Sequence, residues 1–200
     1  MNYKHIYHAG NFADVAKHVA LLYCLQALCR KESPFFVLDT HAGRGYYDLQ
    51  AAEAAKSGEA ERGIQTLIAA AAGAAPLLDY MSAIRARHGK RLARYPGSPA
   101  LIAQCLRPQD RALFVELMPA EARTIDREIE SQGRFSTEID DGYAVLKASI
   151  AAAGKKVADA EVRYGIVPFP NKSLEAAMLE TAGRVGLPAE CMPEGYMHDA

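Results

Sequence analysis

Three short apolar segments of this chain each end at an acidic residue, and a segment with helical character follows each of them. The segments are Phe35–Leu38 before Asp39, Ala112–Val115 before Glu116, and Phe135–Ile139 before Asp140 and Asp141. Repeated alternation of a strand and a helix is typical of a parallel sheet with helices on both faces. We therefore predict an α/β fold whose three acids gather at one edge of the sheet, where such folds bind ligands.

The first of these segments leads into a loop that contains Gly43 and Gly45. Phe35–Leu38 shows no polar alternation, as expected of a strand covered on both faces. Two glycines in a tight loop allow the backbone to approach a nucleotide-like ligand closely. A glycine pair by itself is also compatible with an ordinary turn between a strand and a helix.

The chemistry of the three acids suits a nucleoside. A carboxylate after the second strand can accept hydrogen bonds from both ribose hydroxyls, and one after the third can accept the amino group of adenine. Each acid alone is also a possible helix cap, and Asp141 before Gly142 is a good candidate for that role. A nicotinamide cofactor is disfavoured, because its ribose-binding acid lies about 20 residues after the glycine loop and no strand occurs there.

Residues Tyr3–Asn11 are polar, aromatic and glycine-bearing, so we expect an extended arm or loop before the first helix. Apolar residues recur at a helical period from Phe12 to about Arg30. Asn11 can cap this helix, and Asp14 suits its positive end. Asp14, Lys17 and His18 fall together on the opposite, polar face.

Alanine-rich sequence with helical character separates the first strand from the second. We predict a single domain over residues 1–200, with a helical insertion over residues 50–106. Five cations lie within ten residues of this insertion, without an acid: Arg85, Arg87, Lys90, Arg91 and Arg94. Such a run is either a basic patch for nucleic acid or the solvated face of a helix.

The composition excludes several classes of protein. Half of the 200 residues are hydrophobic, which indicates a soluble globular chain. Its 23 Lys and Arg and 24 Asp and Glu give a net charge of −1, so the overall charge does not attract nucleic acid. The four cysteines form no C-x-x-C pair, the apolar stretches are too short or interrupted for a membrane span, and no signal peptide opens the chain. We therefore expect a cytoplasmic protein without disulfides.

A metal site is not expected from the histidines. His5, His8, His18 and His41 are four of the six histidines, and the spacing of His5 and His8 suits metal ligands. No cysteine or paired carboxylate lies near them in the sequence to complete a tetrahedral set. Hydrogen bonding around a charged nucleoside is the better interpretation.

Several segments, taken in order, resemble a known family over about three quarters of the chain. They are Tyr3–Asn11 with Asp14, Lys17 and His18; Leu38–Gly43; Tyr95–Pro99; Glu116–Leu117; and Asp141–Gly142. These segments resemble the bacterial 23S rRNA (adenine-N6)-methyltransferase J family. The resemblance implies a class I methyltransferase fold of the Rossmann type that uses S-adenosylmethionine, with a small helical insertion after the first strand.

The resemblance also implies roles for individual residues. The cofactor contacts would be His18, His41, Ser98, Glu116, Asp141 and Gly142. The substrate RNA would be contacted by Tyr3, with His5 and Lys17 nearby, and by Arg85 and Arg91 through its phosphates. The implied partner is 23S rRNA free of ribosomal protein, and we expect a monomer that does not bind a membrane.

One segment of the family is not found in this sequence, which contains no Asp-Pro-Pro or Asn-Pro-Pro. In related enzymes that segment holds the protons of the adenine amine and stacks an aromatic ring on the flipped base. The stretch Tyr164–Asn171 is either a degenerate form of it, with Phe169 stacking and Asn171 replacing the acid, or a later strand reached after a deletion. Residues Ser173–Arg184 fit the deletion better, so we expect a sheet that is incomplete on its carboxyl-terminal side. Two functions stay open: methylation, or binding of cofactor or RNA without catalysis.

Overall fold

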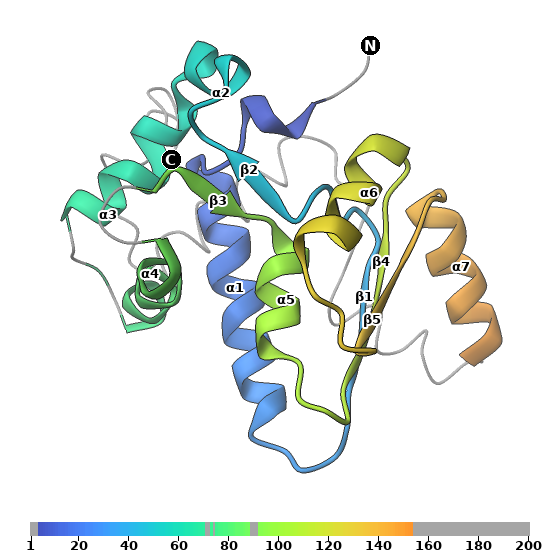
Figure 1. Cartoon of the computed structure of the whole chain (residues 1–200). Coiled ribbons are helices and arrows are strands. Elements are labelled where there is room, and N and C mark those ends of the chain that lie inside the picture. Colours follow the sequence, from blue (N-terminus) through green and yellow to red (C-terminus); the bar gives the residue numbers. More distant parts are fainter. Residues whose placement is uncertain (1–3, 71–72, 74, 89–91, 154–200) are drawn as a thin grey trace, which may run out of the picture.

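The computed structural model describes residues 4–70, 73, 75–88 and 92–153 (Figure 1). The amino-terminal half contains η1 (His5–Tyr7), α1 (Phe12–Cys29), β1 (Phe36–Asp39), β2 (Tyr46–Asp48), α2 (Ala52–Ser57), η2 (Glu61–Gln65), α3 (Thr66–Ala70) and α4 (Ala75–His88). The rest contains β3 (Arg94–Pro96), α5 (Ser98–Cys105), β4 (Arg111–Val115), α6 (Pro119–Glu128), β5 (Phe135–Glu138) and α7 (Gly142–Ala153). The predicted alternation of strands and helices is confirmed over these residues.

A parallel three-stranded sheet in the order β1-β4-β5 forms the centre of the fold. Asp39 pairs with Phe114 across β1 and β4, and Val115 pairs with Glu138 across β4 and β5, so the three strands end at nearly the same level. Helices α5 and α6 cover one face, where Ile102, Phe114 and Ile125 belong to one buried cluster. Helix α7 lies on the other side of the sheet (Figure 1).

The sequence prediction for the first strand was partly wrong. β1 begins at Phe36, whose side chain is 62% exposed, and its other residues are only partly buried. Within the described residues β1 pairs with β4 alone. The unbroken apolar run therefore does not mean that both faces are covered here.

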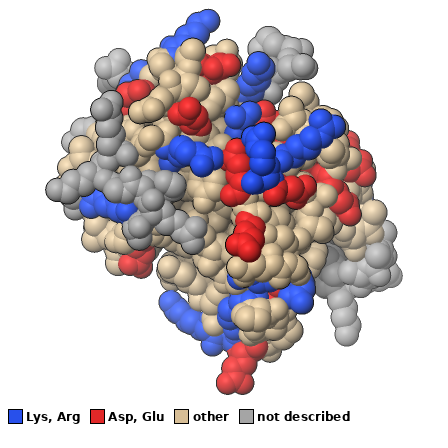
Figure 2. Space-filling view, viewed as in Figure 1, with Lys and Arg blue, Asp and Glu red and all other residues tan. Residues whose placement is uncertain are grey.

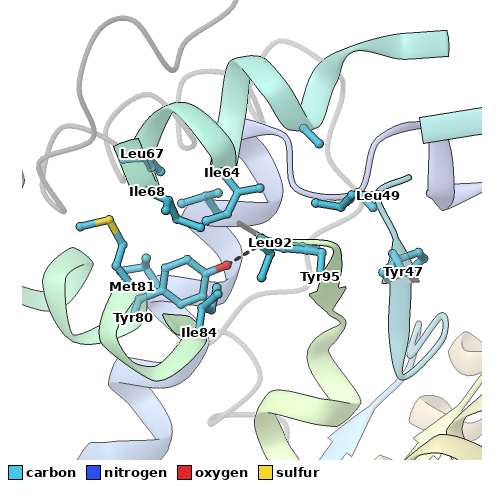
Figure 3. Close-up of a cluster of buried hydrophobic side chains, with 14 of the residues drawn as sticks. Tyr47, Leu49, Ile64, Leu67, Ile68, Tyr80, Met81, Ile84, Leu92 and Tyr95 are labelled. Carbon is cyan, nitrogen blue, oxygen red and sulfur yellow. Dashed lines mark hydrogen bonds between the residues drawn. The ribbon is translucent and has the colours of Figure 1, made fainter. Parts of the chain in front are cut away.

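Residues between β1 and β4 form a second buried core, which the strand pattern alone did not reveal. An antiparallel ribbon of β2 and β3 joins its two ends, with Tyr47 opposite Tyr95. Figure 3 shows how side chains from η2, α3, α4 and the ribbon meet, among them Ile64, Leu67 and Tyr80. Burial of each large apolar side chain contributes about 1.5–3 kcal/mol, so this packing stabilises the short helices against the rest of the chain.

Helix α1 follows the predicted bounds closely, and the side chain of Asn11 caps it by accepting a hydrogen bond from the amide of Asp14 at 2.9 Å. Its predicted polar face is not a solvated face, however. Asp14 is 2% exposed and His18 is 7% exposed, whereas Lys17 is exposed. Two of the three polar groups are thus buried between α1 and its neighbours.

By length and composition α1 is also long and apolar enough to cross a membrane, with a mean hydropathy of 1.3 over 18 residues. The expectation that no apolar stretch is long enough was therefore wrong on length. The helix packs against α4, α5 and η2 and contributes Val15, Val19 and Leu22 to the buried core. A core helix of a globular protein has these same properties.

Candidate cofactor site and amino-terminal arm

Glu116 lies directly after β4 and organises the glycine loop. Its Oε2 accepts a hydrogen bond from the amide of Gly43 at 2.8 Å, and its Oε1 accepts one from the amide of Met118 at 2.8 Å. Gly43 has a φ of +64°, a left-handed conformation that favours glycine. One carboxylate therefore joins the loop after β1 to the loop after β4.

Asp39 lies at the end of β1 and is joined to the start of α5. The hydroxyl of Ser98 donates a hydrogen bond to its Oδ2 at 2.6 Å, and the amide of His41 donates one to its Oδ1 at 3.3 Å. Burial raises the pKa of Asp39, with a smaller contribution from the negative charge of Glu116, and the two donors oppose the shift. The Glu116 carboxylate is thus near enough to affect the pKa of Asp39.

Asp141 and Gly142 bring the third strand end to the same place. Asp141 caps α7 by accepting a hydrogen bond from the amide of Tyr143 at 2.9 Å, as its position before Gly142 suggested. A Cβ at Gly142 would overlap the carbonyl oxygen of Thr40, so only glycine permits this contact between α7 and the loop after β1. His41 lies beside it, with its ring packed edge-on against that of Tyr143 at 5.0 Å between centroids.

Exposed apolar side chains surround these acids. Leu117 and Met118 follow Glu116, Ile139 follows β5, and Tyr143 lies in the first turn of α7. All four are more than one-third exposed, and Leu117 is 64% exposed. Apolar surface next to a few converging polar groups is typical of a small-molecule site.

His18 takes part in a different set of contacts. Its Nδ1 hydrogen-bonds the hydroxyl of Tyr95 at 2.9 Å, and that hydroxyl also pairs with the hydroxyl of Tyr80 at 2.8 Å. Burial lowers the pKa of His18 to about 4, although the charge of Asp14 opposes the shift. The structure thus places a neutral His18 in a buried chain that joins α1, β3 and α4. The hydrogen bonds of the described residues do not connect it to the three acids.

The amino-terminal arm, which we define as residues 4–11, is held against α1 by Asp14. Asp14 Oδ2 accepts hydrogen bonds from His5 Nε2 at 2.7 Å and from the amide of Gly10 at 3.2 Å, and Oδ1 pairs with Lys17 Nζ at 2.8 Å. Burial alone would raise the pKa of Asp14, but the hydrogen bond from His5 and the charges of its partners hold it well below its usual range. His5 and Lys17, two of the predicted RNA contacts, therefore share one buried carboxylate, whereas Tyr3 lies outside the described residues.

The basic run is only partly described. Arg85 donates a hydrogen bond to the carbonyl of Ile68, and Arg94 pairs with Glu128 and lies over the ring of Tyr46. The side chains of Arg87, Lys90 and Arg91 lie outside the described residues. On the face shown in Figure 2, basic side chains lie among acidic ones, in keeping with ion pairs such as Arg44–Glu121.

Two acids that the sequence analysis did not assign are important for the arm and the glycine loop. Glu59 accepts hydrogen bonds from His8 and Asn11, and Glu121 forms a two-point ion pair with Arg44. None of these three pairs could be recognised in the sequence, because their members are 48 to 77 residues apart. Among the described residues, no group of three or more His, Cys, Asp or Glu is arranged to hold a metal ion.

Comparison with known proteins identifies the family. Residues 32–158 match the family described as ribosomal RNA large subunit methyltransferase D, RlmJ. The chain belongs to the RlmJ family. The matched residues include all three acids at the strand ends, and both the predicted family and the predicted α/β methyltransferase fold are confirmed.

Two relatives are each named ribosomal RNA large subunit methyltransferase J. The Haemophilus influenzae protein is 38% identical over 152 residues, which cover 75% of this chain and 54% of the relative. The Escherichia coli protein is 34% identical over 157 residues, which cover 78% of this chain and 56% of the relative. The chain thus spans about half the length of these relatives.

A crystal structure of a Legionella pneumophila protein is also similar. Its TM-score is 0.66 at 28% sequence identity, with 90% of this chain and 76% of that chain covered. The three-dimensional likeness thus agrees with the family match.

Proposed function

We propose that this chain binds S-adenosylmethionine at the carboxyl ends of β1, β4 and β5, and that it takes part in N6-methylation of an adenine in 23S rRNA. The observation that carries this proposal is the gathering of Asp39, Glu116 and Asp141 around the glycine loop, joined by the contacts of Gly43 and Gly142. Membership of the RlmJ family supplies the class of reaction.

The side chains at this edge fit the adenosine part of the cofactor. Each carboxylate oxygen can accept more than one hydrogen bond, so Glu116 can hold the ribose hydroxyls while it keeps Gly43 and Met118. Asp141 can accept the amino group of adenine while it caps α7. The exposed side chains of Leu117 and Ile139 can cover the faces of the base. His41 and Ser98 lie next to Asp39, on the side of the glycine loop. When bound, the cofactor supplies the methyl group.

The RNA would lie along the amino-terminal arm. Tyr3, His5 and Lys17 would contact the substrate, and Arg85 and Arg91 would contact its phosphates from a helical insertion over residues 50–106. The buried Asp14 supports this role, because it holds His5 and Lys17 in one arrangement. The proposed substrate is 23S rRNA free of ribosomal protein, bound by a cytoplasmic monomer. A cofactor role for His18 would be indirect, through Tyr95 and the start of α5.

A second candidate is a chain that binds cofactor or RNA without transferring the methyl group. The observation that favours it is that no Asp-Pro-Pro segment occurs in these 200 residues. Tyr164–Asn171, the stretch expected to be either a degenerate catalytic segment or a later strand, lies outside the described residues. The two functions therefore differ in the transfer step and not in the binding site described above.

Two measurements test these proposals. Calorimetric titration with S-adenosylmethionine, and with NAD as a control, is expected to give binding of the first ligand only; absence of binding refutes the cofactor site. Transfer of a labelled methyl group to protein-free 23S rRNA is expected if the chain is itself an enzyme. Cofactor binding without transfer supports the second candidate.

A further inference from the structure

The amino-terminal arm is fastened to the helical segment before α3 as well as to α1. Asn11 makes both connections with one side chain: its Oδ1 accepts the amide of Asp14 at 2.9 Å, and its Nδ2 donates to Glu59 Oε2 at 2.9 Å. The Glu59 carboxylate also hydrogen-bonds His8 Nδ1, at 3.0 and 3.1 Å from its two oxygens. The arm thus meets one acid that lies 48 residues further along the chain.

Backbone contacts support the same junction. The amide of Ile64, in η2, donates a hydrogen bond to the carbonyl of Gly10 at 2.8 Å. Ile64 itself is fully buried in the core between η2, α4 and α1. The arm is therefore joined to this part of the chain at two points, by the hydrogen bond of Gly10 to Ile64 and by the hydrogen bond of Asn11 to Glu59.

We infer that Asn11 and Glu59 are positioning residues that hold the arm in the arrangement that binds RNA. This inference rests on the proposed function, because it takes the arm as an RNA contact. Glu59 fixes the end of the arm at His8 and Asn11, and Asp14 fixes His5 and Lys17. The surface that faces the RNA is then set by two carboxylates from different parts of the chain.

The choice of an amide at position 11 supports this role. Aspartate caps helices as well as asparagine does, and its charge suits the positive end of a helix. Capping alone therefore does not require asparagine. Next to Glu59, however, position 11 must donate a hydrogen bond, and a carboxylate would place two negative charges about 3 Å apart.

The test exchanges the two groups. In Asn11→Asp the cap is kept and the arm is repelled from Glu59, so binding of a 23S rRNA transcript is expected to weaken about tenfold. In the double variant Asn11→Asp with Glu59→Gln the amide and the carboxylate have changed places, and binding is expected to return to within about twofold of wild type. Glu61→Gln is the matched control, because it removes the same charge from an exposed side chain two residues away.

The measurements are RNA affinity by fluorescence anisotropy, S-adenosylmethionine affinity by calorimetry, and the melting temperature. We expect Asn11→Asp to weaken the RNA affinity and to leave the S-adenosylmethionine affinity unchanged. A loss of melting temperature that parallels the loss of RNA affinity, or a double variant that binds no better than Asn11→Asp, overturns the inference. If Asn11→Asp binds the transcript as tightly as the wild-type chain does, the inference is overturned, while the proposed function stands. If the wild-type chain does not bind the transcript, the RNA part of the proposed function fails and the inference fails with it.

Discussion

Replacement of Glu116 by alanine is the most direct test of the cofactor site. In the structure both oxygens of its carboxylate are engaged, with the amides of Gly43 and Met118 at 2.8 Å. We propose that the same oxygens accept the ribose hydroxyls. Glu116→Ala therefore removes the charged acceptor for the cofactor and also one support of the glycine loop.

The expected size of the effect follows from hydrogen bonds to a charged group, which contribute about 1.5–3 kcal/mol. At about 1.4 kcal/mol for each factor of ten, Glu116→Ala should weaken S-adenosylmethionine binding about 10- to 150-fold. Glu116→Gln keeps one oxygen acceptor and should lie between alanine and wild type. The melting temperature should change little, because the amides of Gly43 and Met118 are near the surface and water can replace their partner.

Isothermal titration calorimetry of the three proteins measures these affinities directly. Glu32→Ala is a suitable control, since it removes an exposed carboxylate from the turn before β1, at the opposite end of that strand. An affinity for S-adenosylmethionine that is the same in Glu116→Ala as in wild type would refute the assignment of this acid to the ribose. An equal loss in Glu32→Ala would show that general electrostatics, and not a specific contact, causes the effect.

The other predictions concern the RNA surface, the buried histidine and the contact of α7. Replacement of Arg85 and Arg91 together by alanine should flatten the dependence of RNA affinity on salt concentration; an unchanged slope in binding titrations would show that these arginines do not contact RNA phosphates. The folded-state pKa of His18 is lowered from 6.5 to about 4. As the pH falls, His18 therefore takes up its proton in the unfolded chain before it does so in the folded chain. The contribution of the neutral His18 to stability is complete above the unfolded-state pKa and is lost between these two pKa values. Urea unfolding should show a loss of about 2 kcal/mol from this group between about pH 7 and about pH 5, and His18→Gln should remove that part of the pH dependence; an identical dependence in the variant would argue against a buried neutral histidine. Gly142→Ala should lower the free energy of unfolding by about 1–3 kcal/mol and weaken cofactor binding, because its Cβ would overlap the Thr40 carbonyl; a variant with wild-type stability in denaturant titration would show that α7 is free to move away.

The local elements of the sheet were predictable from the sequence. The apolar runs that end at Asp39 and Glu116 became β1 and β4, and the helical period after Asn11 became α1. These signals are local: side-chain spacing, a cap residue and an acid at the end of a strand act within a few residues. The helical insertion over residues 50–106 as a separate unit stays a prediction.

The ribbon of β2 and β3 was not predicted, although Tyr47 and Tyr95 are both fully or nearly fully buried there. Each strand is only three residues long, which is too short for a periodic pattern. Its two strands are separated by four helical segments in the chain. Only their packing against the common core brings them together.

In the candidate site, too, some features follow from the sequence and others only from the tertiary structure. Sequence alone determined which chemical groups are present and that Asp39, Glu116 and Asp141 follow strands, because strand ends and caps depend on near neighbours. Tertiary structure decided that Asp14 is buried between His5 and Lys17, that His18 bonds Tyr95, and that Glu59 holds Asn11. The pair joining α1 to β3 spans 77 residues and the pair joining the arm to Glu59 spans 48. The charge of a buried group also depends on partners that only the folded chain supplies.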